Sequence, residues 1–112
     1  MAVDVLVDID PQKMRTLKSI EEVLKRIINF EREHGCRTGV VVIQRKQFPP
    51  LYEIVSQEEG EKWLKKTVSA TTPEFGIKYY SRHYFEALLK RCRGNTDYPL
   101  PKPLTWEHYR TQ

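Results

Sequence analysis

The chain has 112 residues, which is enough for one domain with its own core, because single domains typically contain about 100 to 150 residues. Its 39% hydrophobic and 30% charged residues exclude a disordered chain, and no run of eighteen apolar residues is present that would cross a membrane. The net charge of +4 is modest, and it is unevenly distributed.

The first two predicted elements are a strand and an amphipathic helix. Residues 1–10 alternate between one side rich in Val and Ile and one side rich in Asp, which is typical of a half-buried strand, and Pro11 ends it. A helix then begins at Ser19, which forms a capping box with Glu22. Gly35 stands where a left-handed C-terminal cap is expected.

The rest of the chain predicts two strands, two helices and a tail. The run VVVI at 40–43 is apolar on both faces and predicts a central strand, and 51–55 predicts its antiparallel hairpin partner. Ser56 and Glu59 repeat the capping-box pattern at the start of a helix. A last helix is predicted over residues 79–93, before Gly94-Asn95.

These elements predict an α+β (or α/β) fold in the order β-α-β-β-α-α. We expect a small three-stranded mixed sheet with the helices packed on it, and a right-handed crossover if the first two strands are parallel neighbours. Residues 1–95 form a single domain, and residues 96–112 form an extended tail rich in proline that docks on its own core or on a partner. Three strands leave two open edges, so a homodimer is also expected.

The segment KYYSRHYF at 78–85 is unusually rich in aromatic and basic residues. On a helical wheel, most of its rings point toward the core, which is the commoner role of aromatic side chains. The exceptions lie at the exposed rim of the predicted helix, where they would stack on a base or contact a partner: Tyr79, His83 and, as a further candidate, Tyr80, beside Arg82 and Lys90.

The basic residues concentrate in one segment. Residues 62–93 contain eight Lys or Arg and two Glu, a net charge of +6. If the last two helices pack side by side, their outward faces form one basic surface that neutralises phosphates, and a solvated lysine-rich exterior is the alternative. We therefore expect a small non-enzymatic module that binds DNA or RNA through Lys62, Lys65, Lys66, Lys78, Tyr79, Arg82, His83, Lys90 and Arg93.

Two other functions remain open. The proline- and aromatic-rich tail favours a protein-interaction or structural homodimer. Asp8 and Asp10 share one face of the first strand and, with Glu53, would hold the hard metal ion of a metal-dependent nuclease, although a solvated strand face is the commoner reading. The His and Cys spacing does not fit zinc and no glycine-rich phosphate loop is present, so we expect no cofactor.

Composition also bears on the setting of the protein. The two cysteines, Cys36 and Cys92, and the acidic rather than basic first segment indicate free thiols in the cytoplasm, of a host cell if the protein is viral. Scarce Ala, Gly and Asn beside abundant Lys and Glu are typical of thermophile proteins.

Overall fold

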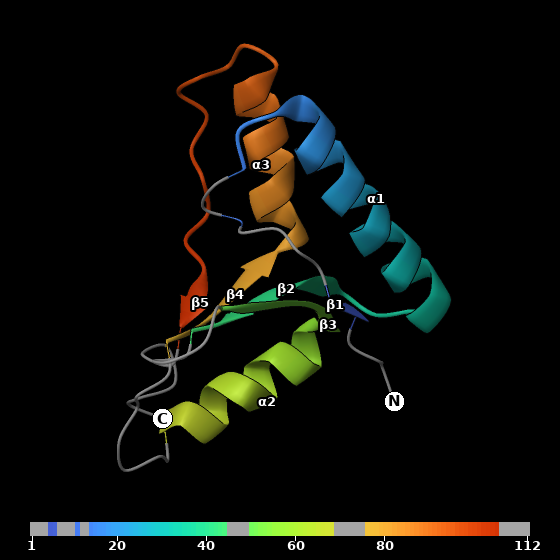
Figure 1. The fold of residues 1–112 in the computed structure, drawn as a ribbon, viewed down its shortest axis with the longest axis vertical. Coiled ribbons are helices and arrows are strands. Elements are labelled where there is room, and N and C mark those ends of the chain that lie inside the picture. The colour runs from blue at the N-terminus through green and yellow to red at the C-terminus, as the bar shows by residue number, and fades with distance from the viewer. Residues whose placement is uncertain (1–4, 7–10, 12–13, 45–49, 69–75, 106–112) are drawn as a thin grey trace.

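A computed structural model of the chain describes residues 5–6, 11, 14–44, 50–68 and 76–105 (Figure 1). Its elements, in chain order, are β1 (Val5–Leu6), α1 (Leu17–His34), β2 (Thr38–Ile43), β3 (Leu51–Ser56), α2 (Gln57–Val68), β4 (Ile77–Ser81), α3 (Arg82–Cys92) and β5 (Leu104–Thr105).

The strands form one sheet in the order β1-β3-β2-β4-β5, and every described pair is antiparallel. The predicted α+β class is therefore confirmed. The predicted three-stranded mixed sheet is wrong in number and direction, because β4 and β5 add two strands and β1 pairs antiparallel with β3. The first two strands are not neighbours, because β3 lies between them; since both pair antiparallel with β3, they run parallel to each other without sharing hydrogen bonds.

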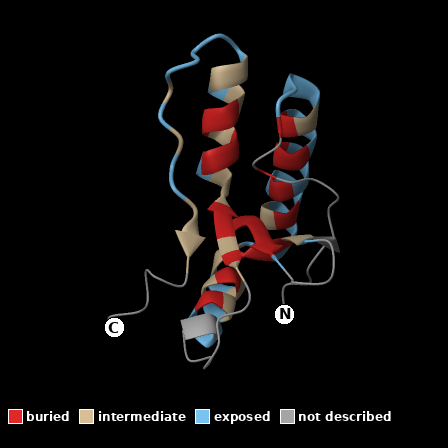
Figure 2. Cartoon of the chain, turned by 60° about the vertical axis from the view of Figure 1, so that its left-hand side comes forward, coloured by how far each residue is buried: buried red, intermediate tan, exposed pale blue. Residues whose placement is uncertain are grey.

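Strand β2 lies at the centre of the sheet and is covered on both faces, as its VVVI run predicts. Val40 and Val42 pack into the core beneath α1 and α3, whereas Val41 and Ile43 pack toward α2. Figure 1 shows α1 and α3 above the sheet and α2 below it. The fold thus has two helical layers that sandwich one sheet, and buried residues line both faces of that sheet (Figure 2).

The aromatic-basic segment is not one helix. Residues up to Ser81 form β4, which pairs with β2 along its whole length, and α3 starts at Arg82. The predicted helix over 79–93 is therefore wrong for its first three residues. Strand alternation sends Tyr80 into the core under α1 and α3, and Tyr79 into the core under α2. Burial against both layers outweighs the helical pattern.

Local signals place most helix ends correctly. Helix α1 begins at Leu17 rather than Ser19, because the Thr16 hydroxyl accepts the hydrogen bond of the Ser19 amide. Gly35 is its left-handed C-cap with φ 61°, as predicted. The Ser56 hydroxyl accepts a 3.1 Å hydrogen bond from the Glu59 amide at the start of α2. The predicted strand over residues 1–10 lies outside the described residues, except for Val5–Leu6.

Tyr79 is a packing residue between β4 and α2. It is 1% exposed, and its hydroxyl has no hydrogen-bond partner among the described residues. Burial, followed by the nearby carboxylates of Glu31 and Glu61, raises the pKa of its phenol far above the ordinary value, so the ring stays neutral. Its ring lies against Gly60 and Gly39, whose missing side chains leave the room for it.

This packing predicts that Gly60→Ala destabilises the protein. Helix propensity alone favours alanine by about 1 kcal/mol. A Cβ at position 60, however, would lie 2.5 Å from Cδ2 of the buried Tyr79 ring. We expect the free energy of unfolding to fall by roughly 1–3 kcal/mol, the usual cost of overpacking.

Urea denaturation measures this change, with Glu58→Ala in the exposed part of the same helical turn as control. The double variant with Tyr79→Leu should lose most of the penalty, because the ring that meets the new Cβ is gone. A Gly60→Ala protein more stable than the parent would contradict the packing argument.

Candidate functional site

The basic residues predicted to form one surface lie in two layers. Helix α2 packs on one face of the sheet and α3 on the other, so the two helices are not side by side (Figure 1). The condition for a single basic face over residues 62–93, that the last two helices pack side by side, is therefore not met by the described helices. Tyr79 is buried rather than at an exposed rim, and Lys78 lies in β4.

The α2 layer has no net charge within its helix. It contains three Lys and three Glu. Lys62 lies 3.5 Å from the half-buried Glu59 (i,i+3) and 3.9 Å from the exposed Glu58 (i,i+4). The other two cations of this helix, Lys65 and Lys66, are exposed. Such a balanced helix attracts polyanions weakly.

At the first turn of α3, the cations are already compensated. Arg82 donates hydrogen bonds to Glu31 at 2.8 Å and to Glu86 at 3.1 Å, and Nδ1 of His83 lies 3.6 Å from Glu86. A polar cavity of about 290 Å³ beside them is lined by Arg37 as well as by Glu31. Because this cavity mixes both signs of charge, it is a poor site for an anion.

The opposite end of the layer formed by α1 and α3 has an excess of cations. Helix α1 starts beside the C-terminus of α3, since the Cys92 thiol donates to the Arg15 carbonyl at 3.7 Å. We name five cations there the basic end: Arg15, Lys18, Lys90, Arg91 and Arg93. The two segments that contain them, 14–22 and 90–98, hold five cations and three carboxylates.

The cations of the basic end differ in the ion pairs and hydrogen bonds that they make. Arg93 pairs with Glu21 at 3.5 Å, and both side chains are more than half exposed. Lys90 donates to the Tyr98 hydroxyl at 3.0 Å and lies over the Tyr98 ring. Arg15 is exposed, and its guanidinium makes no ion pair or hydrogen bond with a described residue. The first turn of α1 also contains no acidic residue that would balance it.

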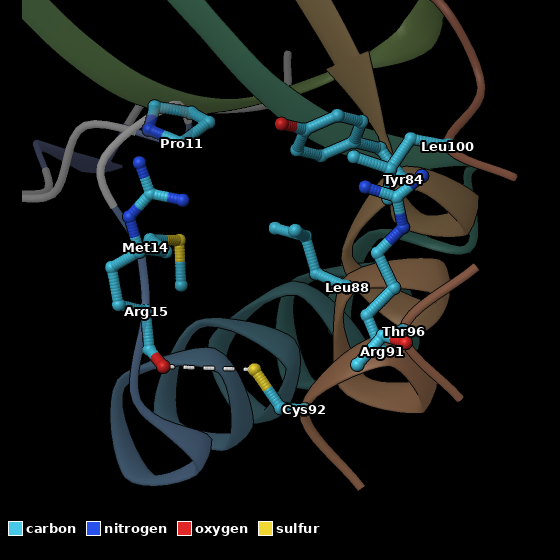
Figure 3. A pocket seen from close by; sticks show the side chains of 9 residues that line it. All are labelled: Pro11, Met14, Arg15, Tyr84, Leu88, Arg91, Cys92, Thr96 and Leu100. Atoms are coloured by element: carbon cyan, nitrogen blue, oxygen red, sulfur yellow. Dashed lines mark hydrogen bonds between the residues drawn. The ribbon is translucent and has the colours of Figure 1, made fainter. Parts of the chain in front are cut away.

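A pocket of about 280 Å³ opens within the basic end (Figure 3). Arg15 and Arg91 lie on opposite sides of it, one from the segment before α1 and one from α3. Its apolar lining comes from Pro11, Met14, Leu88 and Leu100, and its other described lining residues are Tyr84, Cys92 and Thr96. The described lining therefore contains two cations and no carboxylate.

The chain after α3 forms one wall of this pocket. Nε of Arg91 donates to the Tyr98 carbonyl, which fixes the guanidinium, and Leu100 packs on the core of α1 and α3. Further on, β5 pairs with β4, and Leu104 packs on the α2 side of the sheet. The part of the predicted tail that the structure describes, 96–105, thus lies along its own chain.

The candidate metal site is largely outside the described residues. Asp8 and Asp10 lie there, whereas Glu53 stands in β3 opposite Leu6 of β1. The described ranges contain no group of three or more His, Cys, Asp or Glu side chains able to hold a metal ion.

Comparison with protein-family models, with curated proteins and with solved structures finds no match to this chain. None of the helices within the described ranges is long and apolar enough to cross a bilayer.

The residues predicted from sequence include neither Arg15 nor Arg91. Arg15 is 76 positions from Arg91 in the chain, so no local pattern joins them. Counting charge over a continuous segment selects neighbours in sequence, whereas this site joins three separate segments. The only usable local signal is the absence of an acidic residue in the first turn of α1.

The docked tail generates a stability prediction. A chain that ends at Asn95 loses β5, Leu100 and Leu104, and we expect its free energy of unfolding to fall by roughly 2–4 kcal/mol from lost apolar burial. A chain that ends at Thr105 keeps all of these contacts and is the matched control. Thermal unfolding followed by circular dichroism compares the two chains. Equal stabilities would show that residues 96–105 contribute nothing to the free energy of unfolding.

Proposed function

We propose that the protein is a small, non-enzymatic module that binds nucleic acid through the basic end of the α1–α3 layer. The observation that carries the proposal is the pairing of Arg15 and Arg91 around a pocket whose described lining has no carboxylate. Guanidinium groups suit phosphate, because their planar donors match two phosphate oxygens at once.

The distribution of charge between the layers supports this surface over the one expected from sequence. Helix α3 with its cap residue Arg93 has four cations and one carboxylate, whereas α2 has three of each. Three of the α3 cations, Lys90, Arg91 and Arg93, lie in or beside its last turn. Of the residues predicted from sequence, Lys90 and Arg93 therefore remain in the proposed surface.

Binding of labelled single- and double-stranded DNA and RNA tests this proposal at two salt concentrations. We expect binding that weakens steeply as salt rises, because each phosphate contact releases a counterion. The variant Arg15→Gln/Lys18→Gln should bind more weakly and reduce the salt slope by roughly 1–2.

The variant Lys65→Gln/Lys66→Gln is the matched control, because it removes the same charge from the opposite face of the sheet. Its binding should stay close to that of the parent. An equal loss of affinity in the two variants would mean that binding depends on the α2 side as well or on the net charge of the protein alone. Absence of binding to every probe at low salt would end the proposal.

Self-association is a second candidate function, favoured by an apolar groove on α1. Ile28 is 40% exposed, and a groove of about 330 Å³ beside it is lined by Leu24 and Leu89. The two edges of the sheet are β1 and β5, each with two described residues, so they offer few backbone groups for pairing with another chain. An exposed face of α1 is therefore a better reason for a dimer than an edge strand.

Charge complementarity indicates a second copy of this chain as the occupant. Glu21 and Arg32 stand at the two ends of the groove, eleven residues or about three helical turns apart on α1. Two antiparallel copies of α1 centred between them would bring Glu21, which also pairs with Arg93 of its own chain, opposite Arg32 of the partner subunit, and the two-fold symmetry would repeat the pair. Ile28 would then pack against the stem of Lys25.

Light scattering after size exclusion measures the mass and tests this dimer. Ile28→Lys should yield monomer, and Arg32→Glu should weaken association by placing like charges together. Combining Glu21→Arg with Arg32→Glu should restore the dimer, which a loss of packing alone would not do. A parent chain that stays monomeric at high concentration would exclude this candidate.

A further inference from the structure

The lining of the pocket in the basic end combines cationic and apolar side chains. Arg15 and Arg91 flank it from two different segments, and Figure 3 shows their side chains on either side of the opening. Between them lie the apolar side chains of Met14 and Leu88. A ligand that satisfies both parts needs an anionic group joined to an apolar or flat body.

The two guanidinium groups are suited to one shared anion. Arg91 is oriented by the bond from its Nε to the Tyr98 carbonyl, which leaves its two terminal nitrogens to donate elsewhere. The Arg15 guanidinium makes no ion pair or hydrogen bond with a described residue, so within the described part of the chain it is available to the anion. A phosphate accepts from two such forks at once, whereas one carboxylate has fewer oxygens to share.

The volume limits the size of this ligand. About 280 Å³ is near the lower end of small-molecule sites and corresponds to roughly nine water molecules at ~30 Å³ each. One base or sugar with its phosphate is of the right order, and a stacked pair of nucleotides is too large. A base inside a duplex is also stacked and paired, so it cannot enter without being extruded.

We infer that this pocket binds one unpaired nucleotide, with its phosphate between Arg15 and Arg91 and its base or sugar against Met14 and Leu88. The inference rests on the proposed nucleic-acid binding and adds to it the form of the ligand. The same chemistry has two sources, a free mononucleotide and a nucleotide within a single strand.

The first experiment uses adenosine 5′-monophosphate as the probe. The chain has two methionines, so a sample labelled with ¹³C in the Met methyl groups gives two signals, which Met14→Leu assigns. Addition of the nucleotide should shift the Met14 signal, because Met14 lines the pocket. Adenosine, which lacks the phosphate, should produce little shift at equal concentration, and inorganic phosphate should bind without moving the methyl signal as far.

The variant Arg15→Gln tests the role of the guanidinium, and it should fold normally because the side chain is exposed. Its affinity for the nucleotide should fall about tenfold or more, as expected for loss of hydrogen bonds to a charged group. Arg91→Lys keeps the positive charge but not the two parallel N–H donors of the guanidinium, so its affinity for the nucleotide should fall less than that of Arg15→Gln. Lys65→Gln on the other face is the control and should bind like the parent.

The second experiment separates the two sources and the two proposals. An unpaired 12-nucleotide strand should bind more tightly than the same sequence in a duplex, and the mononucleotide should compete with it. If the strand binds but the mononucleotide neither shifts Met14 nor competes, the pocket inference fails while nucleic-acid binding stands. If the mononucleotide binds and no oligonucleotide does, nucleic-acid binding fails and the pocket takes a free nucleotide. Equal loss in Arg15→Gln and Lys65→Gln also overturns the inference.

Discussion

Burial of β2 on both faces is the constraint on which the two-layer arrangement depends. A strand with apolar side chains at four consecutive positions must be covered above and below, since burying only one face would leave two of them in water. The chain meets this requirement with α1 and α3 on one side and α2 on the other. The same requirement separates α2 from α3 and so divides the cations between two surfaces.

A central strand also needs hydrogen-bonded neighbours on both sides, and this need explains the division of KYYSRHYF. The hairpin partner β3 occupies one side of β2, and β4 occupies the other. Tyr79 and Tyr80 then take opposite faces and fill both cores, with the help of the small residues Gly39 and Gly60. What resembles a recognition surface in sequence is chiefly the joint between a strand and a helix.

The position of the candidate site follows from how α1 and α3 pack. Their antiparallel contact is tied by Arg82 with Glu31 at one end and by Arg93 with Glu21 at the other. The first end is neutralised, whereas the second adds Arg15 and Arg91 around a pocket that the chain after α3 completes. Cations already committed to ion pairs contribute little to binding a polyanion, so the number of basic residues is a poorer guide than their partners.

The sequence by itself determined the α+β class, the central position of β2, its hairpin with β3, and the caps at Gly35 and Ser56, because these depend on local periodicity and on backbone conformation. Only the tertiary structure decided that Tyr79 is buried, that α2 and α3 lie on opposite faces, and that Arg15 meets Arg91 across a pocket. Those outcomes depend on contacts between segments far apart in the chain, and a local sequence pattern contains no information about the energy of such contacts. A strand that completes a sheet buries more than a marginal helix does, so tertiary pairing outweighs local pattern where the two compete.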